Sequence, residues 1–416
     1  MVTIRASEQG LIQVDRARRR KGWLKQSEIW CRLAQTSRAT LKRFWRREAI
    51  DQGTFIAICQ AAGIQDWEAI AQSDVRPTEQ HLCLGMMPDV PMFLGRAAEM
   101  AQLTDWSQTC RLIALWGMGG MGKTSLVAEW VESLLRSGSA QPFAAIFWRS
   151  LQYPPALDAL ARSLTEAAQS SVQSSVESSI QSPAQILTLL QQRRCLLILD
   201  SWEALLGGAS AGQVKPEFVA FSQLFQQFAT TRHQSCVVVI SREKPAELAL
   251  LEGLNPLVKS HKLEGMGQDA IALFESRGLQ AELPAWQTLI QLYRGNPLAL
   301  NMMASLIQDL CQGSATAFLK MNTIVVHQLD NVLVERLQCL SETELQVLQT
   351  LARVGQPISR ESLQEKLGSV SGSQLLEILL SLEQRCLLEI LSEETVLFAL
   401  APIVQKYISQ KLSKRL

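Results

Sequence analysis

The sequence predicts an α/β fold whose core is a parallel sheet covered by helices on both faces. Two observations carry this prediction. Residues 117–124 read Gly-Met-Gly-Gly-Met-Gly-Lys-Thr, which fits the phosphate-loop pattern G-x-x-x-x-G-K-[ST]. Around this loop, from about residue 110 to 265, strand-like runs that are apolar throughout alternate with helical stretches. Such strands are typical of a parallel sheet buried on both faces. The core is therefore predicted to be a P-loop NTPase.

The phosphate loop has the context that its chemistry requires. Residues 112–116 before it are predicted to form a buried strand, and residues 125–131 after it a helix. Glycines let the backbone curl so that successive N–H groups meet phosphate oxygens, and the helix N-terminus adds a partial positive charge. Lys123 is expected to reach the β- and γ-phosphates, and the Thr124 hydroxyl to bind Mg²⁺. A glycine-rich turn that binds nothing is the alternative interpretation.

Four apolar runs are predicted to form the sheet. They are 111–116, 144–148, 195–200 and 236–241. Residues 263 to about 303 are predicted to be helical, with a second helix beginning near Gly295. Helices near 341–353, 359–367 and 373–384, followed by strands at 386–390 and 396–400, indicate a winged helix.

Two further strand ends carry candidate catalytic residues. The run 195–200 ends in Asp200, which can hold Mg²⁺ through water, or can simply cap the next helix. Glu203 is the nearest free carboxylate that could orient an attacking water, although surface glutamates are common. Arg242 follows the last core strand and could contact the γ-phosphate, or be an ordinary surface arginine. The predicted catalytic residues are Lys123, Asp200, Glu203 and Arg242, and the predicted metal ligands are Thr124 and Asp200.

The N-terminal segment is strongly basic. Residues 1–50 hold 13 Lys/Arg and 4 Asp/Glu, a net charge of +9, whereas the remainder carries −8. Short helices at 26–34 and 38–48, joined by a tight turn, favour a helix-turn-helix domain that binds duplex DNA. Docking of this basic face on the acidic remainder is the alternative. The residues expected to contact DNA are Ser37, Arg38, Thr40, Lys42, Arg43 and Arg46.

These patterns divide the chain into five parts. We expect an all-α helix-turn-helix-like domain (1–72), a linker (73–91), a nucleotide-binding domain (92–262), a helical domain (263–329) and a winged-helix domain (330–416). No apolar run approaches the length of a membrane span, and the N-terminus has no apolar leader. Nine scattered cysteines form no Cys-x-x-Cys pair. The composition therefore predicts a cytoplasmic protein without a membrane partner.

Taken in order, the motifs resemble the NB-ARC class of STAND ATPases, with a helix-turn-helix segment of the bacterial type. Residues 93–96 look like the hhGR motif, 196–200 like Walker B and 241–242 like sensor one. Residues 295–300, Gly-Asn-Pro-Leu-Ala-Leu, are similar to the family's Gly-Leu-Pro-Leu-Ala-Leu motif. The resemblance implies that ATP or ADP is held, with Mg²⁺, by Phe93, Gly95, Arg96, Gly117, Gly119, Gly120, Met121, Gly122, Lys123, Thr124, Ser125 and Pro297.

The sequence departs from the family at two positions. Ser201 stands where a second acid often follows the Walker B aspartate, and Leu400-Ala401-Pro402 stands where the Met-His-Asp motif would lie. Fast hydrolysis is therefore not expected. Such proteins also usually carry C-terminal repeats that sense a ligand, so we expect either a shortened member or a separate sensor protein.

The resemblance implies an ADP/ATP switch of signal transduction or transcription regulation. Nucleotide exchange would open the domains and drive homo-oligomerisation, with slow ATP hydrolysis returning the resting state. Two other functions remain open. One is a turnover ATPase acting on DNA, and the other is an adaptor whose basic N-terminal domain binds a protein partner.

Overall fold

The computed structural model describes residues 3–4, 6, 8–48, 50–64, 67, 70, 85, 87–136, 143–169, 184–207, 211–279, 283–321, 337–368, 370–392 and 395–413. The chain is divided into two compact units, Met1–Gln80 and His81–Leu416. Most of the predicted linker (73–91), and the Ser/Gln-rich stretch 170–182, lie outside the described residues. No helix among the described residues has both the length and the apolar character to cross a bilayer.

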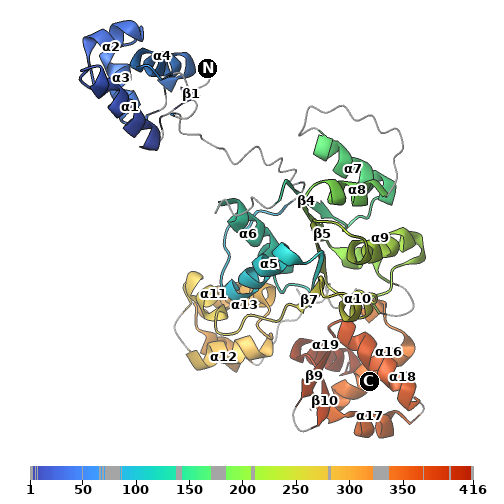
Figure 1. Ribbon diagram of the computed structural model, residues 1–416. Helices are drawn as coiled ribbons and strands as arrows, with labels where there is room; N and C mark the ends of the chain where they lie inside the picture. Colours follow the sequence, from blue (N-terminus) through green and yellow to red (C-terminus); the bar gives the residue numbers. More distant parts are fainter. Residues whose placement is uncertain are drawn as a thin grey trace. The chain divides into compact units, whose positions relative to one another are not determined.

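A five-stranded parallel sheet forms the centre of the larger unit (Figure 1). Its order is β4-β5-β6-β3-β7, so β6 separates the phosphate-loop strand β3 from β5, which ends in Asp200. The four predicted strands are present, within two residues at their ends, and the fifth was not predicted. That fifth strand lies at the sheet edge and four of its five residues are polar, so it lacks the apolar run that marks a central strand. The strands are β3 (Leu112–Trp116), β4 (Ala145–Ser150), β5 (Cys195–Asp200), β6 (Cys236–Ser241) and β7 (Val258–Lys262).

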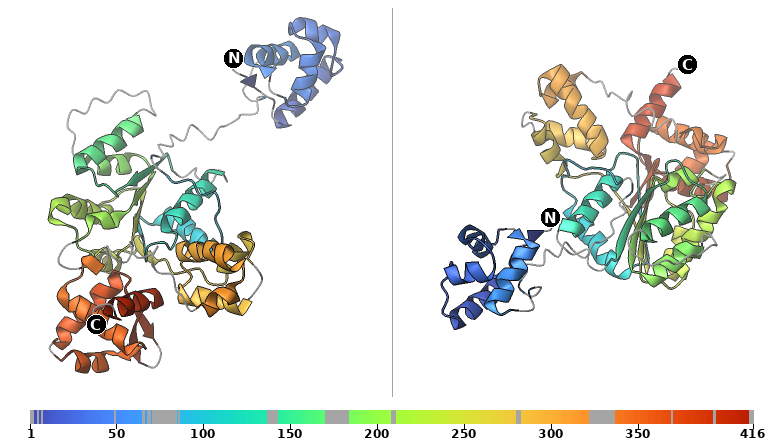
Figure 2. Two further views of the ribbon diagram at one scale, coloured as in Figure 1. Left: turned by 180° about the vertical axis from the view of Figure 1, so that it is seen from behind. Right: turned by 90° about the horizontal axis from the view of Figure 1, so that it is seen from above.

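Helices cover both faces of this sheet, which confirms the predicted core (Figure 2). Alternate strand residues belong to two separate apolar clusters, one on each face. On β5, for example, Leu197 and Leu199 face one way and Leu196 and Ile198 the other. One cluster includes α5 (Ala97–Thr109) and α6 (Lys123–Arg136). The other includes residues of α7 (Leu157–Gln169), α8 (Ala184–Gln192), the short 3₁₀ helix η1 (Trp202–Leu205), α9 (Val219–Thr230) and α10 (Leu248–Leu254). A second 3₁₀ helix, η2 (Pro216–Phe218), packs against this cluster.

A helical subdomain follows β7 and has its own apolar core. It contains α11 (Ala270–Ser276), α12 (Leu283–Leu292), α13 (Pro297–Cys311) and α14 (Ala315–Lys320). The helix that begins after Gly295 is therefore the third of this group and not the second, because two separate short helices precede it.

The C-terminal subdomain, residues 337–413, also packs around a core of its own. Its elements are α16 (Glu342–Val354), β8 (Ile358–Ser359), α17 (Arg360–Leu367), α18 (Gly372–Gln384), β9 (Leu388–Ser392), β10 (Val396–Leu400) and α19 (Pro402–Ser413). The three predicted helices and the strand pair are present, and β8 adds a third strand in the order β8-β10-β9. Strand β9 begins two residues later than predicted, since Cys386 has a φ of 56° that no strand residue adopts.

The N-terminal unit holds α1 (Glu8–Arg20), α2 (Glu28–Leu33), α3 (Arg38–Trp45) and α4 (Gln52–Ala62). It is not entirely helical, because β1 (Thr3–Ile4) pairs antiparallel with β2 (Ile50–Asp51). Two-residue strands are too short to leave a periodic pattern in the sequence. The sequence also predicts a short helix at 67–71, and most of these residues lie outside the described part of the chain.

Candidate nucleotide site

The phosphate loop connects the end of β3 to the start of α6. Gly117, Gly120 and Gly122 have φ values of 146°, 83° and 85°, in the region that favours glycine. A Cβ at Gly120 would also lie 2.7 Å from Asn296 Oδ1. Gly120 is therefore needed for two reasons: its positive φ lets the loop curl, and the absence of a Cβ lets Asn296 of the helical subdomain approach closely.

Lys123 is buried inside this loop. Its Nζ donates to the carbonyl oxygens of Gly117, at 2.7 Å, and Met118, at 2.9 Å. Two backbone carbonyls thus hold the ammonium group within the curl of the loop. Its contact with the β- and γ-phosphates stays a prediction.

Thr124 and Asp200 lie together, although they come from different elements. The Thr124 hydroxyl donates to Asp200 Oδ1 at 3.1 Å, and the Ser201 backbone N–H donates to the same oxygen at 2.8 Å. Burial raises the pKa of Asp200 to about 6. A hydroxyl beside a buried carboxylate is a set of hard oxygen ligands, and it therefore fits Mg²⁺.

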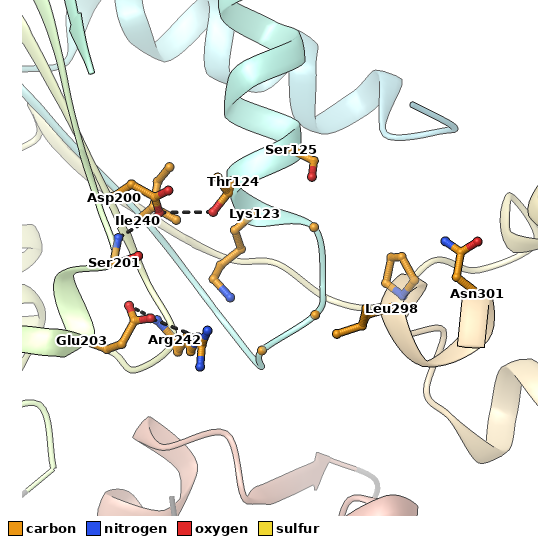
Figure 3. A pocket seen from close by; sticks show the side chains of 14 residues that line it. Lys123, Thr124, Ser125, Asp200, Ser201, Glu203, Ile240, Arg242, Leu298 and Asn301 are labelled. Atoms are coloured by element: carbon orange, nitrogen blue, oxygen red, sulfur yellow. Dashed lines mark hydrogen bonds and ion pairs between the residues drawn. The ribbon is translucent and has the colours of Figure 1, made fainter. Parts of the chain in front are cut away.

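Glu203 and Arg242 form an ion pair at the same edge of the sheet. Arg242 Nε lies 3.0 Å from Glu203 Oε1, and the Arg242 backbone N–H donates to Oε2 at 3.1 Å. Figure 3 shows the two side chains turned toward each other. The sequence suggested a role for each residue but not their contact, which joins η1 to the end of β6 across 39 residues.

Asn296 holds the helical subdomain against the phosphate loop. Its Nδ2 donates to the Gly119 carbonyl at 2.8 Å, and its Oδ1 caps α13 by accepting from the Ala299 N–H at 3.1 Å. The Leu298 N–H donates to the Gly120 carbonyl at 3.2 Å. Asn296 was not among the predicted site residues. Its position directly before a proline at a helix start was the available signal.

A pocket of about 370 Å³ lies between these groups (Figure 3). Of the residues predicted to bind nucleotide or act in catalysis, most line it, together with four that were not predicted: Ser201, Ile240, Leu298 and Asn301. The lining comprises Gly119, Gly120, Gly122, Lys123, Thr124, Ser125, Asp200, Ser201, Glu203, Ile240, Arg242, Pro297, Leu298 and Asn301.

Five predicted nucleotide-binding residues lie outside the lining of this pocket. Gly117 and Met121 belong to the loop itself, and Phe93 packs on the apolar core behind it. Arg96 is buried and donates to the carbonyls of Glu264, at 2.6 Å, and Met121, at 3.4 Å. A Cβ at Gly95 would lie 2.6 Å from Asp269 Oδ2. In this structure residues 93–96 thus tie the back of the loop to the helical subdomain.

The predicted DNA-contacting residues all lie in or next to α3. Ser37 caps this helix by accepting from the Thr40 N–H at 3.1 Å, and the two hydroxyls lie 2.9 Å apart. Leu41 and Phe44 are buried, whereas Arg38, Lys42, Arg43 and Arg46 are exposed. Arg38 lies 3.3 Å from Glu28, and Glu48 lies 3.4 Å from Arg43 and 3.9 Å from Arg46. The helix therefore presents a mainly basic outer face.

The sequence of this chain is similar to a family of NTPases. The family model described as Novel STAND NTPase 1 matches residues 87–327, which include the sheet, the pocket and the helical subdomain. An uncharacterized WD repeat-containing protein of Nostoc is 32% identical over 458 aligned positions, which cover 99% of this chain and 36% of the relative. The chain thus spans about a third of that relative's length.

A solved structure supports the fold. The Walker-type ATPase of Pyrococcus abyssi is similar with a TM-score of 0.54 at 15% identity, over 76% of this chain and 96% of that one. The STAND part of the sequence resemblance is confirmed by the family match, while the NB-ARC branch stays a prediction.

Proposed function

This chain belongs to the Novel STAND NTPase 1 family, and we propose that it is a switch in which ADP and ATP stabilise different arrangements of its subdomains. The observation that carries the proposal is the pocket itself. Residues of the phosphate loop, the ends of β5 and β6, and the start of α13 line one cavity. A ligand there contacts two subdomains at once, so its affinity depends on how they are arranged.

Each side of the pocket supplies a different part of the binding chemistry. Lys123 and the loop N–H groups bind phosphate oxygens, and Thr124 and Asp200 would hold Mg²⁺, which neutralises phosphate charge. We assign the response to a γ-phosphate to Arg242, because its guanidinium lines the same pocket. Pro297 and Leu298 supply the apolar surface for the base.

We further propose that the C-terminal subdomain is a winged helix of the NB-ARC type and that it moves when the nucleotide changes. The element order α16-β8-α17-α18-β9-β10, with three antiparallel strands, supports the winged-helix assignment. The proposed output is self-association and DNA binding through α3. The name of the Nostoc relative supports a sensor built from WD repeats, supplied in the same or another chain.

Slow hydrolysis suits the proposed switch better than rapid turnover. Ser201 stands after the Walker B aspartate, where a second acid would orient the attacking water, and in the arrangement without nucleotide the carboxylate of Glu203 is paired with Arg242 at 3.0 Å. The steady-state rate of ATP hydrolysis, measured with and without duplex DNA, distinguishes a switch from a turnover ATPase that acts on DNA. Fast turnover stimulated by DNA would favour an ATPase acting on DNA instead.

Replacing Lys123 tests the site. We expect Lys123→Ala to weaken ADP and ATP binding about 10- to 100-fold, the range for losing a charge-assisted bond to phosphate. Isothermal titration measures this, with Lys320→Ala, an exposed lysine of α14, as the matched control. Unchanged ADP affinity in a folded Lys123→Ala protein would show that this pocket is not the nucleotide site.

A further inference from the structure

The three residues after β6 pair with the end of α18. We call residues 242–244 the sensor segment, because Arg242 begins it. The Cys386 thiol donates to the Arg242 carbonyl at 3.8 Å, and the Lys244 N–H donates to the Gln384 carbonyl at 3.1 Å. Between them, Arg385 lies 3.8 Å from Glu243. Residues 242, 243 and 244 thus meet 386, 385 and 384 in antiparallel order.

A second contact extends this pairing to β7. Lys262 Nζ lies 3.2 Å from the carboxylate of Glu383, the residue before Gln384. Lys262 and Lys244 each place their ammonium group 5.3 Å from the ring centroid of Trp116. Trp116 is buried and directly precedes Gly117 of the phosphate loop. The C-terminal subdomain is therefore attached at the ends of β6 and β7, and each of these two attachment points contacts Trp116 of β3 through a lysine.

The sensor segment is also the part of the chain that faces the candidate γ-phosphate position. The Arg242 side chain lines the pocket and is held by Glu203, while its own carbonyl accepts from Cys386. A γ-phosphate carries more negative charge than a carboxylate and would compete with Glu203 for the guanidinium. Movement of Arg242 toward it would strain the backbone contacts of residues 242–244.

We propose that the sensor segment passes the presence of a γ-phosphate to the C-terminal subdomain, and that Glu383 and Arg385 are positioning residues that keep Arg242 on Glu203 in the resting state. This inference rests on the proposed switch function. In the resting state, the contact between the C-terminal subdomain and the sheet is then made by Glu383, at the end of α18, and by Arg385, which follows that helix. Leu400-Ala401-Pro402, at the position of the family's Met-His-Asp motif, offers no histidine for that purpose.

Charge reversal at Glu383 tests the proposal, because neither Glu383 nor Lys262 lines the pocket. We expect Glu383→Lys to shift the ratio of ATP to ADP affinity about fivefold or more toward ATP, the lower end of usual coupling between sites. The double variant Lys262→Glu/Glu383→Lys restores an opposite-charge pair and should return the ratio toward the wild-type value. Glu361→Lys reverses an exposed carboxylate elsewhere in the same subdomain and is the control.

Hydrogen exchange at the Lys244 amide gives a second readout, and the comparison of two nucleotide complexes of the wild type involves no substitution that could lower stability. That amide is bonded to Gln384 across the contact. It should exchange faster in Glu383→Lys without nucleotide, and faster in the wild type with a non-hydrolysable ATP analogue than with ADP. Equal Lys244 exchange in the two wild-type complexes, or an unchanged affinity ratio in Glu383→Lys, would overturn the inference while leaving the switch intact. A wild-type protein that binds neither nucleotide would overturn both.

Discussion

At the scale of single residues, the pocket contains polar groups whose burial costs free energy. Asp200 is the clearest case, since only 8% of its surface is exposed and it accepts from Thr124 and Ser201. Two hydrogen bonds from neutral donors do not replace full hydration of a carboxylate, so burial raises its pKa from 3.8 to about 6. The charged form of Asp200 is therefore unfavourable in the folded protein unless a cation, such as a metal ion bound to phosphate, lies beside it.

This cost predicts the effect of Asp200→Asn on the protein without nucleotide. The folded pKa of about 6 exceeds the unfolded value of 3.8. The contribution of Asp200 to stability is therefore present below pH 3.8 and is lost as the pH rises through about 6. Asparagine keeps the acceptor oxygen for Thr124 and Ser201 but carries no charge. The variant should be more stable than wild type at pH 8, by up to about 3 kcal/mol, and nearly equal near pH 4.

Urea unfolding of both proteins at the two pH values measures this difference. Loss of stability in Asp200→Asn at pH 8 would show that the carboxylate is stabilised by charge in the folded state, contrary to its burial.

At the scale of elements, α3 shows which of its side-chain positions can be predicted from the sequence pattern. Leu41, Phe44 and Trp45 are spaced at i, i+3 and i+4, which predicts that all three lie on one buried stripe. The structure confirms this for Leu41 and Phe44, whereas Trp45 is only half-buried. Trp45 instead donates from its indole nitrogen to the Lys25 carbonyl at 2.9 Å. The contacts of Glu48 with Arg43 and Arg46 depend on the turn after the helix and were not predictable from helical spacing.

If α3 contacts duplex DNA, arginines on its exposed face should contribute to the salt dependence of binding. Arg43→Ala and Arg46→Ala should each weaken binding and lower the slope of log K against log salt by about one unit for each phosphate that the variant no longer neutralises. Fluorescence anisotropy over a salt series measures this. Glu48→Gln should strengthen binding, because it removes a negative charge beside both arginines. Arg360→Ala, in the C-terminal subdomain, is the control, and unchanged slopes in both arginine variants would exclude α3 as the DNA-contacting helix.

At the scale of the larger unit, the two smaller subdomains are attached to the sheet in different ways. The helical subdomain is bonded to the phosphate loop through Asn296, which is 5% exposed, and through the Leu298 backbone. The C-terminal subdomain is attached to the sheet partly through the ion pair of Lys262 with Glu383, and to the helical subdomain through the ion pair of Arg294 with Glu389; all four side chains are partly exposed. Ion pairs near the surface contribute little to stability. The C-terminal attachment is therefore the one we expect nucleotide to release.

Release of the C-terminal subdomain predicts a change in particle mass. With ADP the protein should remain at the mass of the resting form, and with a non-hydrolysable ATP analogue it should form larger particles, because the faces buried in the resting contact become available to other copies. Light scattering after size-exclusion chromatography measures the mass. Lys123→Ala should show no analogue-dependent change. Identical masses of the wild type with ADP and with the analogue would contradict nucleotide-driven self-association.

The sequence by itself determined the parts whose chemistry is local. The glycines and Lys-Thr of residues 117–124, the apolar strands and the helix starts follow from backbone sterics, hydrogen-bond capping and periodic burial within a few residues. Only the tertiary structure decided contacts between distant segments. Glu203 meets Arg242, Asn296 meets Gly119, the edge strand β7 joins β3, and the sensor segment meets the end of α18. These contacts depend on how separate elements pack, and no local spacing in the chain specifies that packing.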